Sequence, residues 1–452
     1  MIYHSVAFLQ GPFLSENIER SLQGKELRAW YPQSSHLNLI SCGDKYAVAA
    51  KGWIAFHASW LWRWKDSIDV TFMNKYGKDL KFMQSVGPNM DTHPVSEATK
   101  ELIQQASMRC GACGSKIGSS ILSRVLGKIA NKHVGNDMLR IEWGDDAAIL
   151  PRVPDKSVAM QTVDFFRAPK SLQDPYIFGY ISAVHAMSDC YAMNAMPSTA
   201  LAIPVIPFAA AEKIEDDLYQ MMSGSIDALK QASCRLIGGH TSEGEDMALG
   251  FSVTGMADEK RIWKRSDALP DDTIILIKSL GTGIILAAAE SGLPVGNFLS
   301  NAILSMCNSN GPALPVLQKF SVHACTDITG FGLLGHLIEI LESSDVSCNI
   351  SLDAIPLLEG VAECISLGIS SSLLPENSQR VDGHVAGSDI AKSLGLWEAL
   401  LDPQTSGGLL FSLPRLEASQ CLHDLHEAGF KDAQCIGNFV PSNGDAFTIN
   451  LK

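Results

Sequence analysis

The sequence has no surplus of positive charge. Its 452 residues carry 35 lysines and arginines against 49 aspartates and glutamates, which gives a formal net charge of -14. Because proteins bind the nucleic-acid backbone mainly through lysine and arginine, this balance argues against nucleic acid as a main partner. With 46% hydrophobic and 19% charged residues the composition is globular, and the length predicts two or three domains.

The sequence also has no long uninterrupted apolar run. The longest, "AMPSTALAIPVIPFAAA" at 195–211, contains three prolines and two hydroxyl residues, so it predicts a buried strand with flanks and not a membrane span. The first residues, "MIYHSVAFLQGPF", place no basic segment ahead of an apolar one, which predicts no secretory signal. We therefore expect a cytoplasmic protein, with the plastid as the alternative compartment.

Cysteines are few and, with one exception, scattered. Eleven are present, and the close pair Cys110 and Cys113 in "MRCGACGSKIG" has no second pair and no histidine pair at the spacing of a zinc site. The odd number argues against a disulfide scaffold. A structural zinc site and a redox dithiol remain alternatives. We favour a reactive thiol beside Lys116, because a nearby cation stabilises a thiolate or an anionic substrate.

No phosphate-binding loop of the form G-x-x-x-x-G-K-[ST] is present, so ATP would have to be held in another way. Several aspartates stand in apolar or glycine-rich surroundings. For each one a cap or turn role is the simpler explanation. Together they favour a site for hard cations such as Mg2+ bridging a polyphosphate: Asp145, Asp146, Asp164, Asp189 and Asp327.

One glycine pattern, "GFGLLG" at 330–335, imitates a dinucleotide-binding turn, with a helical pattern after it and Asp353 further on. The preceding "SVHACTDIT" contains polar residues where a central parallel strand would be apolar. A helix N-terminus that helps bind an anion explains the glycines equally well.

The chain divides into an unusual first part and a longer second part. Five of the eight tryptophans lie in residues 1–92, where "ASWLWRWKDSIDVTFMNKY" predicts an amphipathic helix, either packed or lying on a membrane surface. We interpret 93–107 as a linker. Strand and helix patterns then alternate, which predicts an α/β domain at 108–262 and an α+β domain at 263–452.

Six stretches, in this order, closely resemble the selenide, water dikinases, also called selenophosphate synthetases: "CGACGSKIG", "GDDAAI", "QTVDFFRAPKSLQDPYIFGYISAVHAMSDCYAMNAMPSTALA", "GGHTSEG", "TDITGFGLLGHL" and "DPQTSGGLL". The resemblance implies the two-domain fold of aminoimidazole ribonucleotide synthetase. It also implies conversion of ATP, selenide and water to selenophosphate, AMP and phosphate with Mg2+. A homodimer with the nucleotide near its interface would follow, and a selenium-delivery protein is a further partner that this activity would use.

Carried over residue by residue, the resemblance places Cys113 and Lys116 on the family's essential cysteine and lysine. It implies magnesium ligands at Asp146, Asp189 and Asp327. It implies nucleotide contacts at Lys116, Trp143, Gly144, Asp145, Asp164, Asp189, Gly238, Gly239 and His240. In one departure, His185 stands where the family pattern has asparagine.

The first 85 or so residues resemble a different family, the C-terminal end of NADH dehydrogenase-type pyridine nucleotide-disulfide oxidoreductases. The glycine-rich FAD and NAD loops of those enzymes are absent, so we interpret the segment as a remnant or as the product of a truncated gene, and expect no bound flavin.

Other functions remain as alternatives: a thiamine-monophosphate kinase, a hydrogenase-maturation dehydratase, a silent regulatory partner or a flavoprotein. The presence of both Cys113 and Lys116 favours the dikinase.

Overall fold

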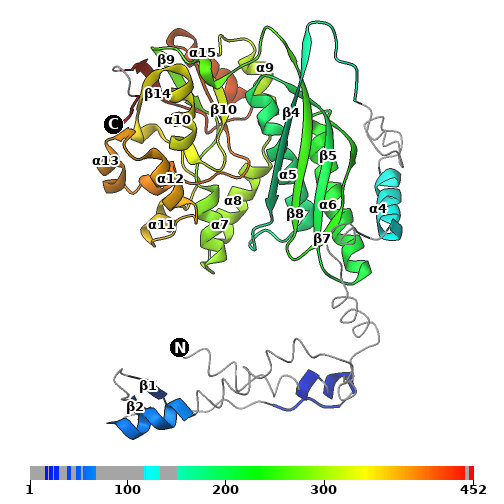
Figure 1. The fold of residues 1–452 in the computed structure, drawn as a ribbon, viewed down its shortest axis with the longest axis vertical. Coiled ribbons are helices and arrows are strands. Elements are labelled where there is room, and N and C mark those ends of the chain that lie inside the picture. The colour runs from blue at the N-terminus through cyan, green and yellow to red at the C-terminus, as the bar shows by residue number, and fades with distance from the viewer. Residues whose placement is uncertain are drawn as a thin grey trace. The chain divides into compact units, whose positions relative to one another are not determined.

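The structure is a computed structural model that describes residues 16–18, 20–23, 25–29, 38–41, 47–51, 54–67, 117, 119–132, 150–442 and 447–452 (Figure 1). The chain forms two compact units, Met1–Ser96 and Glu97–Lys452, and each is described by itself. Six of the residues predicted for the site lie outside the described residues: Cys113, Lys116, Trp143, Gly144, Asp145 and Asp146.

The first unit contains a small antiparallel sheet in the order β1-β2-β3. Its strands are β1 (Asn38–Ser41), β2 (Ala47–Lys51) and β3 (Ile54–Ala58). Residues 59–67 are helical, which confirms the start of the predicted amphipathic helix. Leu61 is buried against Ala47 and Ala49, whereas Trp60 and Trp64 are exposed. The helix therefore packs through Leu61, whereas Trp64, which helical spacing places on the same face, is exposed.

The first sheet of the second unit has the order β4-β8-β5-β6, with β7 also paired to β5. Strands β4, β8 and β5 are antiparallel, and β6 and β7 run parallel to β5. Along β4, side chains alternate between half-buried and exposed, as expected of a strand with one covered face. The strands are β4 (Ser157–Arg167), β5 (Met196–Pro207), β6 (Arg235–Gly239), β7 (Ser242–Gly244) and β8 (Ala248–Asp258).

Three helices accompany this sheet: α4 (Ser119–Lys132), α5 (Pro175–Ala192) and α6 (Ala211–Gln231). Figure 1 shows α5 and α6 side by side along the sheet. Asp174 caps α5, since its Oδ1 accepts the N–H of Ile177 at 3.0 Å and Pro175 occupies the first turn. The ammonium and guanidinium groups of Lys128 and Arg124 on α4 both pair with Glu215 on α6.

The second sheet has seven strands in the order β10-β13-β9-β14-β11-β15-β12. They are β9 (Asp272–Leu276), β10 (Cys325–Asp327), β11 (Val346–Ile350), β12 (Val385–Ala386), β13 (Leu409–Pro414), β14 (Gln434–Pro441) and β15 (Ile449–Leu451). The α-helices of this part are α7 (Thr282–Glu290), α8 (Gly296–Cys307), α9 (Leu314–Leu317), α10 (Gly332–Ser344), α11 (Val361–Ser366), α12 (Leu374–Val381), α13 (Ser388–Ser393), α14 (Trp397–Leu400) and α15 (Arg415–Glu427).

Both faces of the second sheet are buried. On β9, Ile274 joins the core that contains α10, whereas its neighbour Ile275 joins the core that contains α15 and also α5 of the first sheet. Because successive strand residues point to opposite faces, this continuous apolar strand serves two cores. One of those cores is shared with the first sheet, and it fixes α5 against the second sheet.

The glycines of "GFGLLG" do not form a dinucleotide-binding βαβ unit. Strands β10 and β11, which flank α10, are separated in the sheet by β13, β9 and β14. Gly332 has φ +67°, and a Cβ there would lie 2.6 Å from the carbonyl carbon of Leu401. The glycine is needed for this close approach at the start of α10.

The boundary that we predict at 262/263 lies in the connection between β8 and β9, which contains the short 3-10 helix η3 (Arg265–Asp267). Two further 3-10 helices are η4 (Gly311–Ala313) and η5 (Leu352–Ala354). The domain limits themselves remain a prediction.

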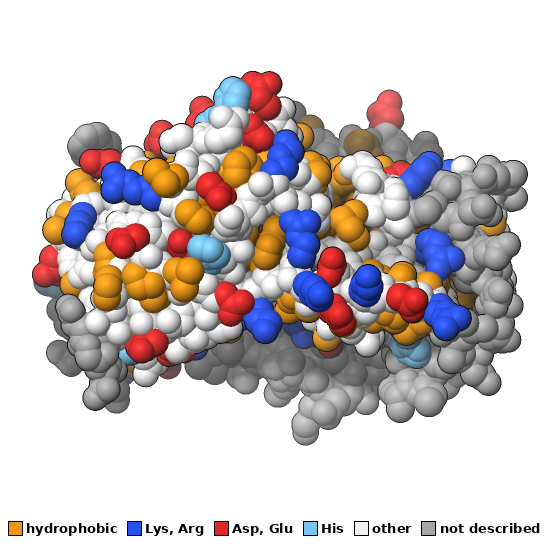
Figure 2. All heavy atoms as spheres, turned by 90° about the horizontal axis from the view of Figure 1, so that it is seen from above, with side chains coloured by type: hydrophobic (Ala, Val, Ile, Leu, Met, Phe, Trp, Pro, Cys, Tyr) orange, Lys and Arg blue, Asp and Glu red, His pale blue; other side chains and the backbone are white. Residues whose placement is uncertain are grey.

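On the surface, acidic and basic side chains are interspersed with apolar ones over the face shown in Figure 2. That face shows no continuous basic area among the described residues. No helix in the described part of the chain is long and apolar enough to cross a membrane.

Helices α5 and α6 approach closely because two glycines lie at their crossing. A Cβ at Gly224 of α6 would lie 1.9 Å from the carbonyl oxygen of Tyr176, and one at Gly179 of α5 would lie 2.0 Å from that of Met221. These contacts are backbone, so a side chain could be accommodated only by moving a whole helix.

We predict that Gly224→Ala lowers the free energy of unfolding by about 1–3 kcal/mol or more, because it forces the two helices apart. The matched control is Gly127→Ala on α4, where a Cβ meets nothing within 4 Å. There the gain in helix propensity should raise stability by about 0.5–1 kcal/mol. Urea unfolding followed by circular dichroism measures both, and equal effects of the two substitutions would contradict the tight crossing.

Candidate active site

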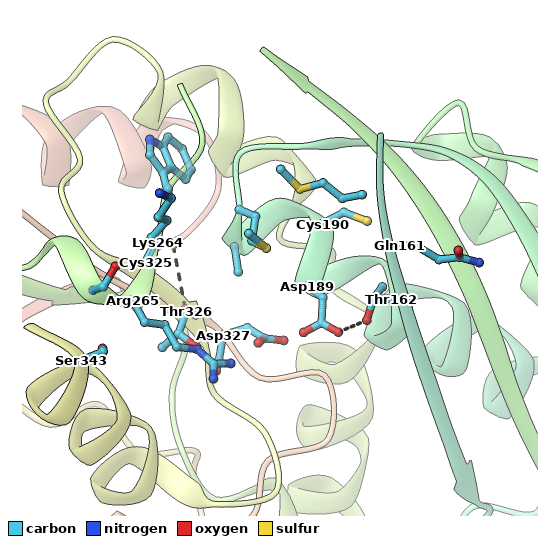
Figure 3. A pocket seen from close by; sticks show the side chains of 15 residues that line it. Gln161, Thr162, Asp189, Cys190, Lys264, Arg265, Cys325, Thr326, Asp327 and Ser343 are labelled. Atoms are coloured by element: carbon cyan, nitrogen blue, oxygen red, sulfur yellow. Dashed lines mark hydrogen bonds between the residues drawn. The ribbon is translucent and has the colours of Figure 1, made fainter. Parts of the chain in front are cut away.

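Three of the predicted aspartates come from three different elements. Asp164 is on β4, on the face that α5 covers, Asp189 is on the last turn of α5, and Asp327 ends the edge strand β10 of the second sheet. Figure 3 shows the carboxylates of Asp189 and Asp327 pointing toward one another. The site therefore lies where α5 of the first sheet meets the edge of the second.

The three carboxylates influence one another electrostatically. Burial, followed by the charges of Asp189 and Asp327, raises the pKa of Asp164 to about 7. Burial and the charge of Asp327 also raise the pKa of Asp189, although the Thr162 hydroxyl donates a hydrogen bond to this carboxylate and opposes the rise. Burial and the neighbouring negative charges thus disfavour the ionised forms of Asp164 and Asp189.

This arrangement fits a divalent cation. Carboxylate oxygens are the ligands that Mg2+ prefers, and a bound cation would stabilise the ionised carboxylates that burial and the neighbouring charges disfavour. Among the described residues no three acidic, histidine or cysteine side chains form a complete metal cluster. Asp146, the third predicted ligand, lies outside the described residues, so the set of Asp146, Asp189 and Asp327 stays a prediction.

A cavity of about 490 Å³ lies beside the carboxylates (Figure 3). Its lining combines the two acidic side chains with two basic ones, several hydroxyl groups and several sulfur atoms. The lining residues are Met160, Gln161, Thr162, Asp189, Cys190, Ala192, Met193, Trp263, Lys264, Arg265, Ser266, Cys325, Thr326, Asp327 and Ser343.

His185 connects the first sheet to the second. The backbone N–H of Ser406 donates to its Nδ1 at 3.0 Å, and its Nε2 lies 3.9 Å from Oδ2 of Asp164. Burial lowers the pKa of His185, so the ring is neutral and its proton is on Nε2, the nitrogen that faces the carboxylate. The Nε2–H group of His185 therefore faces the carboxylate of Asp164.

The loop 402–408, which contains "DPQTSGG", is chiefly a structural support. Gln404 accepts the backbone N–H groups of Gly281 and Thr282 at the start of α7, at 2.9 and 3.2 Å. Asp402 accepts that of Gly283 at 2.9 Å. Together these two side chains accept backbone N–H groups at the start of α7 that have no hydrogen-bond acceptor within the helix.

Lys278 is a further residue of the site's support that sequence reasoning missed. It is buried, and its ammonium group donates to the carbonyl oxygens of Asn308 and Ser406, the latter at 2.9 Å. Burial lowers its pKa to about 7, although the charge of Asp327 acts to raise it. Ser406 is also the residue whose N–H binds His185, so Lys278 supports the contact between the two sheets. A lysine directly after the apolar run "TIILI" was the available signal.

Gly238, Gly239 and His240 lie at the end of β6, away from the carboxylates. In the order β4-β8-β5-β6 they are at the opposite edge from Asp164, and none of them lines the cavity. A Cβ at Gly239 would lie 2.1 Å from the carbonyl oxygen of Ala202, which accepts the N–H of His240 at 2.8 Å. The structure thus separates two sets of predicted nucleotide contacts by the width of the sheet.

Comparison with known proteins gives two matches to family models. The model of the AIR synthase related protein, N-terminal domain, matches residues 144–257, and that of the C-terminal domain matches residues 270–450. These matches do not include residues 1–92, so their likeness to an oxidoreductase stays a prediction.

Curated relatives match along nearly their whole length. The chain is 33% identical over 342 residues to a selenide, water dikinase from Clostridioides difficile (strain 630), covering 75% of this chain and 96% of that protein. It is 36% identical over 344 residues to one from Agathobacter rectalis, covering 75% and 97%.

Solved structures match at lower identity. Thiamine-monophosphate kinase from Stenotrophomonas maltophilia K279a has a TM-score of 0.54 and 20% identity, covering 73% of this chain and 95% of that one. Hydrogenase maturation protein HypE in complex with ATP has a TM-score of 0.57 and 19% identity, covering 73% and 91%. These likenesses concern the fold alone. With the family-model matches, they confirm the predicted two-domain fold.

We predict that Asp164→Asn stabilises the metal-free protein at pH 8. A pKa raised from 3.8 to about 7 means that the folded state binds the proton more tightly than the unfolded state, so the contribution of Asp164 to stability falls as pH rises through that window. The gain at pH 8 should be on the order of 1–2 kcal/mol, reduced by contact with water, and smaller at pH 5.

Thermal unfolding at the two pH values, with metal removed by a chelator, measures this gain. Asp155→Asn is the control, since Asp155 is exposed and away from the cavity. A gain that does not depend on pH, or a loss of stability at pH 8, would contradict the mutual repulsion of the carboxylates.

Proposed function

The chain belongs to the selenide, water dikinase family, and on that premise we propose that it forms selenophosphate from selenide, ATP and water, with release of AMP and phosphate. The observation that carries the proposal is that Asp189 and Asp327 line one cavity and that their charges act on Asp164 nearby. Three carboxylates that repel one another need a cation, and a cation held in this way would bind the phosphates of a nucleotide.

Mg2+ would be held by Asp189 and Asp327, with Asp146 as the third predicted ligand. When bound, it would neutralise negative charge on the phosphates. The chain's own groups orient the ligands: the Thr162 hydroxyl donates to Asp189, and His185 presents its Nε2–H to Asp164. Asp164 in turn would contact the nucleotide.

Cys113 and Lys116 would serve selenide. In the glycine-containing stretch "CGACGSK", Lys116 lies three residues after Cys113 and six after Cys110, so a single turn of chain would bring the ammonium group to Cys113. An adjacent ammonium group favours an anion there, either the thiolate or selenide.

A homodimer would bring the separated nucleotide contacts together. The face of β4 away from α5 exposes Val163 and Phe165, at 64% and 50%, and on β5 Leu201 and Ile203 are only half-buried. A sheet face with these apolar side chains is suited to association with a second copy. Across such an interface, Gly238, Gly239 and His240 of one copy could meet the nucleotide bound by the carboxylates of the other.

The test is the reaction itself. Purified protein incubated under argon with ATP, Mg2+ and selenide should give a selenophosphate resonance in 31P NMR together with AMP. Asp327→Asn keeps the size of the side chain but removes its charge, so turnover should fall about 100-fold or more while the fold survives.

Asp402→Asn is the matched control, because Asp402 is also a buried carboxylate of the second sheet's domain but lies outside the cavity. It should retain turnover within about tenfold. Accumulation of ADP alone would favour the kinase alternative, and near wild-type ATP consumption by Asp327→Asn would contradict the metal assignment.

A second prediction separates the two thiols. Cys113→Ala and Lys116→Ala should abolish selenide-dependent turnover, whereas Cys110→Ala should keep most of it. The 31P NMR assay under reducing conditions measures all three, with circular dichroism to verify the fold. Equal loss in both cysteine variants would mean that the pair works as a dithiol and that Cys113 does not act alone.

A further inference from the structure

A guanidinium group lines the same cavity as the carboxylates. Arg265 is in η3, on the connection between the two sheets, and its side chain lines the cavity with Asp189 and Asp327. Figure 3 shows its guanidinium group ending close to the Asp327 side chain. Its charge reaches the site, since it acts to lower the pKa of Asp189.

Two contacts fix the orientation of this group. Its Nε donates to Oγ1 of Thr326 at 3.1 Å, and its Nη1 lies 2.9 Å from Oε2 of Glu339 on α10. Thr326 directly precedes Asp327, so the guanidinium group is held beside the end of β10 that also positions that carboxylate. A guanidinium group held in this way loses little freedom on binding a further oxygen.

The ion pair with Glu339 does not neutralise the positive charge of Arg265 completely. Glu339 also lies 3.6 Å from the guanidinium group of Arg380, so two arginines share one carboxylate. His336, at 3.2 Å from the same carboxylate, accepts the N–H of Thr329 on its other nitrogen. This cluster of Arg265, Arg380 and Glu339 therefore carries a net charge of about +1 next to the cavity.

The guanidinium group is not required to attach η3 to α10. The backbone carbonyl of Arg265 accepts the hydroxyl of Ser344 at 2.8 Å, and that hydroxyl accepts the N–H of Ala268 at 3.2 Å. These bonds use the backbone of η3 and not the Arg265 side chain. The long side chain thus has a further role beyond holding the turn.

A guanidinium group has five N–H donors, and the two contacts with Thr326 and Glu339 leave several of them facing the cavity, where the side chain is 45% exposed. Paired N–H groups of arginine match the oxygens of a phosphoryl group, which is a tetrahedral oxyanion. The nearby carboxylates would repel such an anion unless a divalent cation accompanied it. The chemistry of the lining therefore selects a phosphate together with Mg2+.

We propose that Arg265 binds a phosphoryl oxygen in this cavity, on the side opposite Asp189, and holds one of the phosphate groups that the reaction releases from ATP. This inference rests on the proposed function, because the reaction must bind and release inorganic phosphate. It adds a residue, from the connection between the two sheets, to those that contact the substrate.

The test uses inorganic phosphate with Mg2+ as the probe, on the full-length protein. Phosphate should raise the unfolding temperature of the wild type, and titration calorimetry should give a dissociation constant. Arg265→Met should weaken phosphate binding about tenfold or more, and Arg265→Lys should weaken it less because the charge is kept.

Arg380→Met is the matched control. It removes the other arginine beside Glu339. The guanidinium carbon of Arg380 lies 5.1 Å from the centre of the Phe331 ring, and Arg380 does not line the cavity. Phosphate affinity should stay within about twofold of the wild type. If both methionine variants lose phosphate binding equally, or if the wild type binds no phosphate in the presence of Mg2+, the inference is wrong.

The same variants separate this inference from the proposed function. Selenophosphate formation by the wild type tests the proposed function, whereas phosphate affinity, read by unfolding and calorimetry, tests Arg265 without turnover. In the steady state, Arg265→Met should lower kcat more than it raises the KM for ATP, because the contact concerns one phosphate among many contacts with the nucleotide. An unchanged kcat would also overturn the inference.

Discussion

Mutual repulsion among Asp164, Asp189 and Asp327 is the constraint on which the rest of this structure depends. The three side chains come from a strand, a helix and the edge of a second sheet, and burial together with their charges moves the pKa of Asp164 to about 7. Such a cluster lowers the stability of the protein at neutral pH unless a cation binds to it. The fold must therefore hold together three groups that repel one another.

Apolar packing holds the elements that carry these three carboxylates together. Helix α5 shares a core with the first sheet and with one face of the second, where Ile275 of β9 and Phe411 of β13 are buried. Directional contacts then set the geometry: Ser406 fixes the His185 ring, Lys278 holds the carbonyl of Ser406, and Thr162 donates to Asp189. The hydrophobic effect is not directional, so these hydrogen bonds decide where each carboxylate points.

The connection between the two sheets has more than a linking role. Arg265 extends from it to Glu339 and Thr326, and so places a cation close to Asp327 in the cavity that the carboxylates line. A cavity lined by groups of both charges is suited to a ligand that is itself a cation bound to an anion, such as Mg2+ with a phosphate. The cavity between the two sheets thus offers contacts to both parts of one ligand.

Local sequence determined much of this protein. The apolar run at 195–211 predicted a buried strand, and β5 spans Met196–Pro207; the alternation of strand and helix patterns after it follows from side-chain periodicity. The motifs around Asp164, Asp189 and Asp327 contain three carboxylates whose charges act on one another in the folded chain, and their roles stay a prediction. Periodicity places both Leu61 and Trp64 on the apolar face of one helix, but only Leu61 is buried.

Only the tertiary structure decided which distant groups meet. The separation of β10 from β11 by three strands excludes the dinucleotide-binding unit that "GFGLLG" imitates, and no local pattern reports strand order. The contacts of Lys278 with Ser406, of His185 with Ser406, and of Arg265 with Glu339 join residues 128, 221 and 74 positions apart. Sequence determined the residue types and the local elements because these depend on near neighbours. The charges that surround each carboxylate come from packing between two sheets, so only the folded chain could place them.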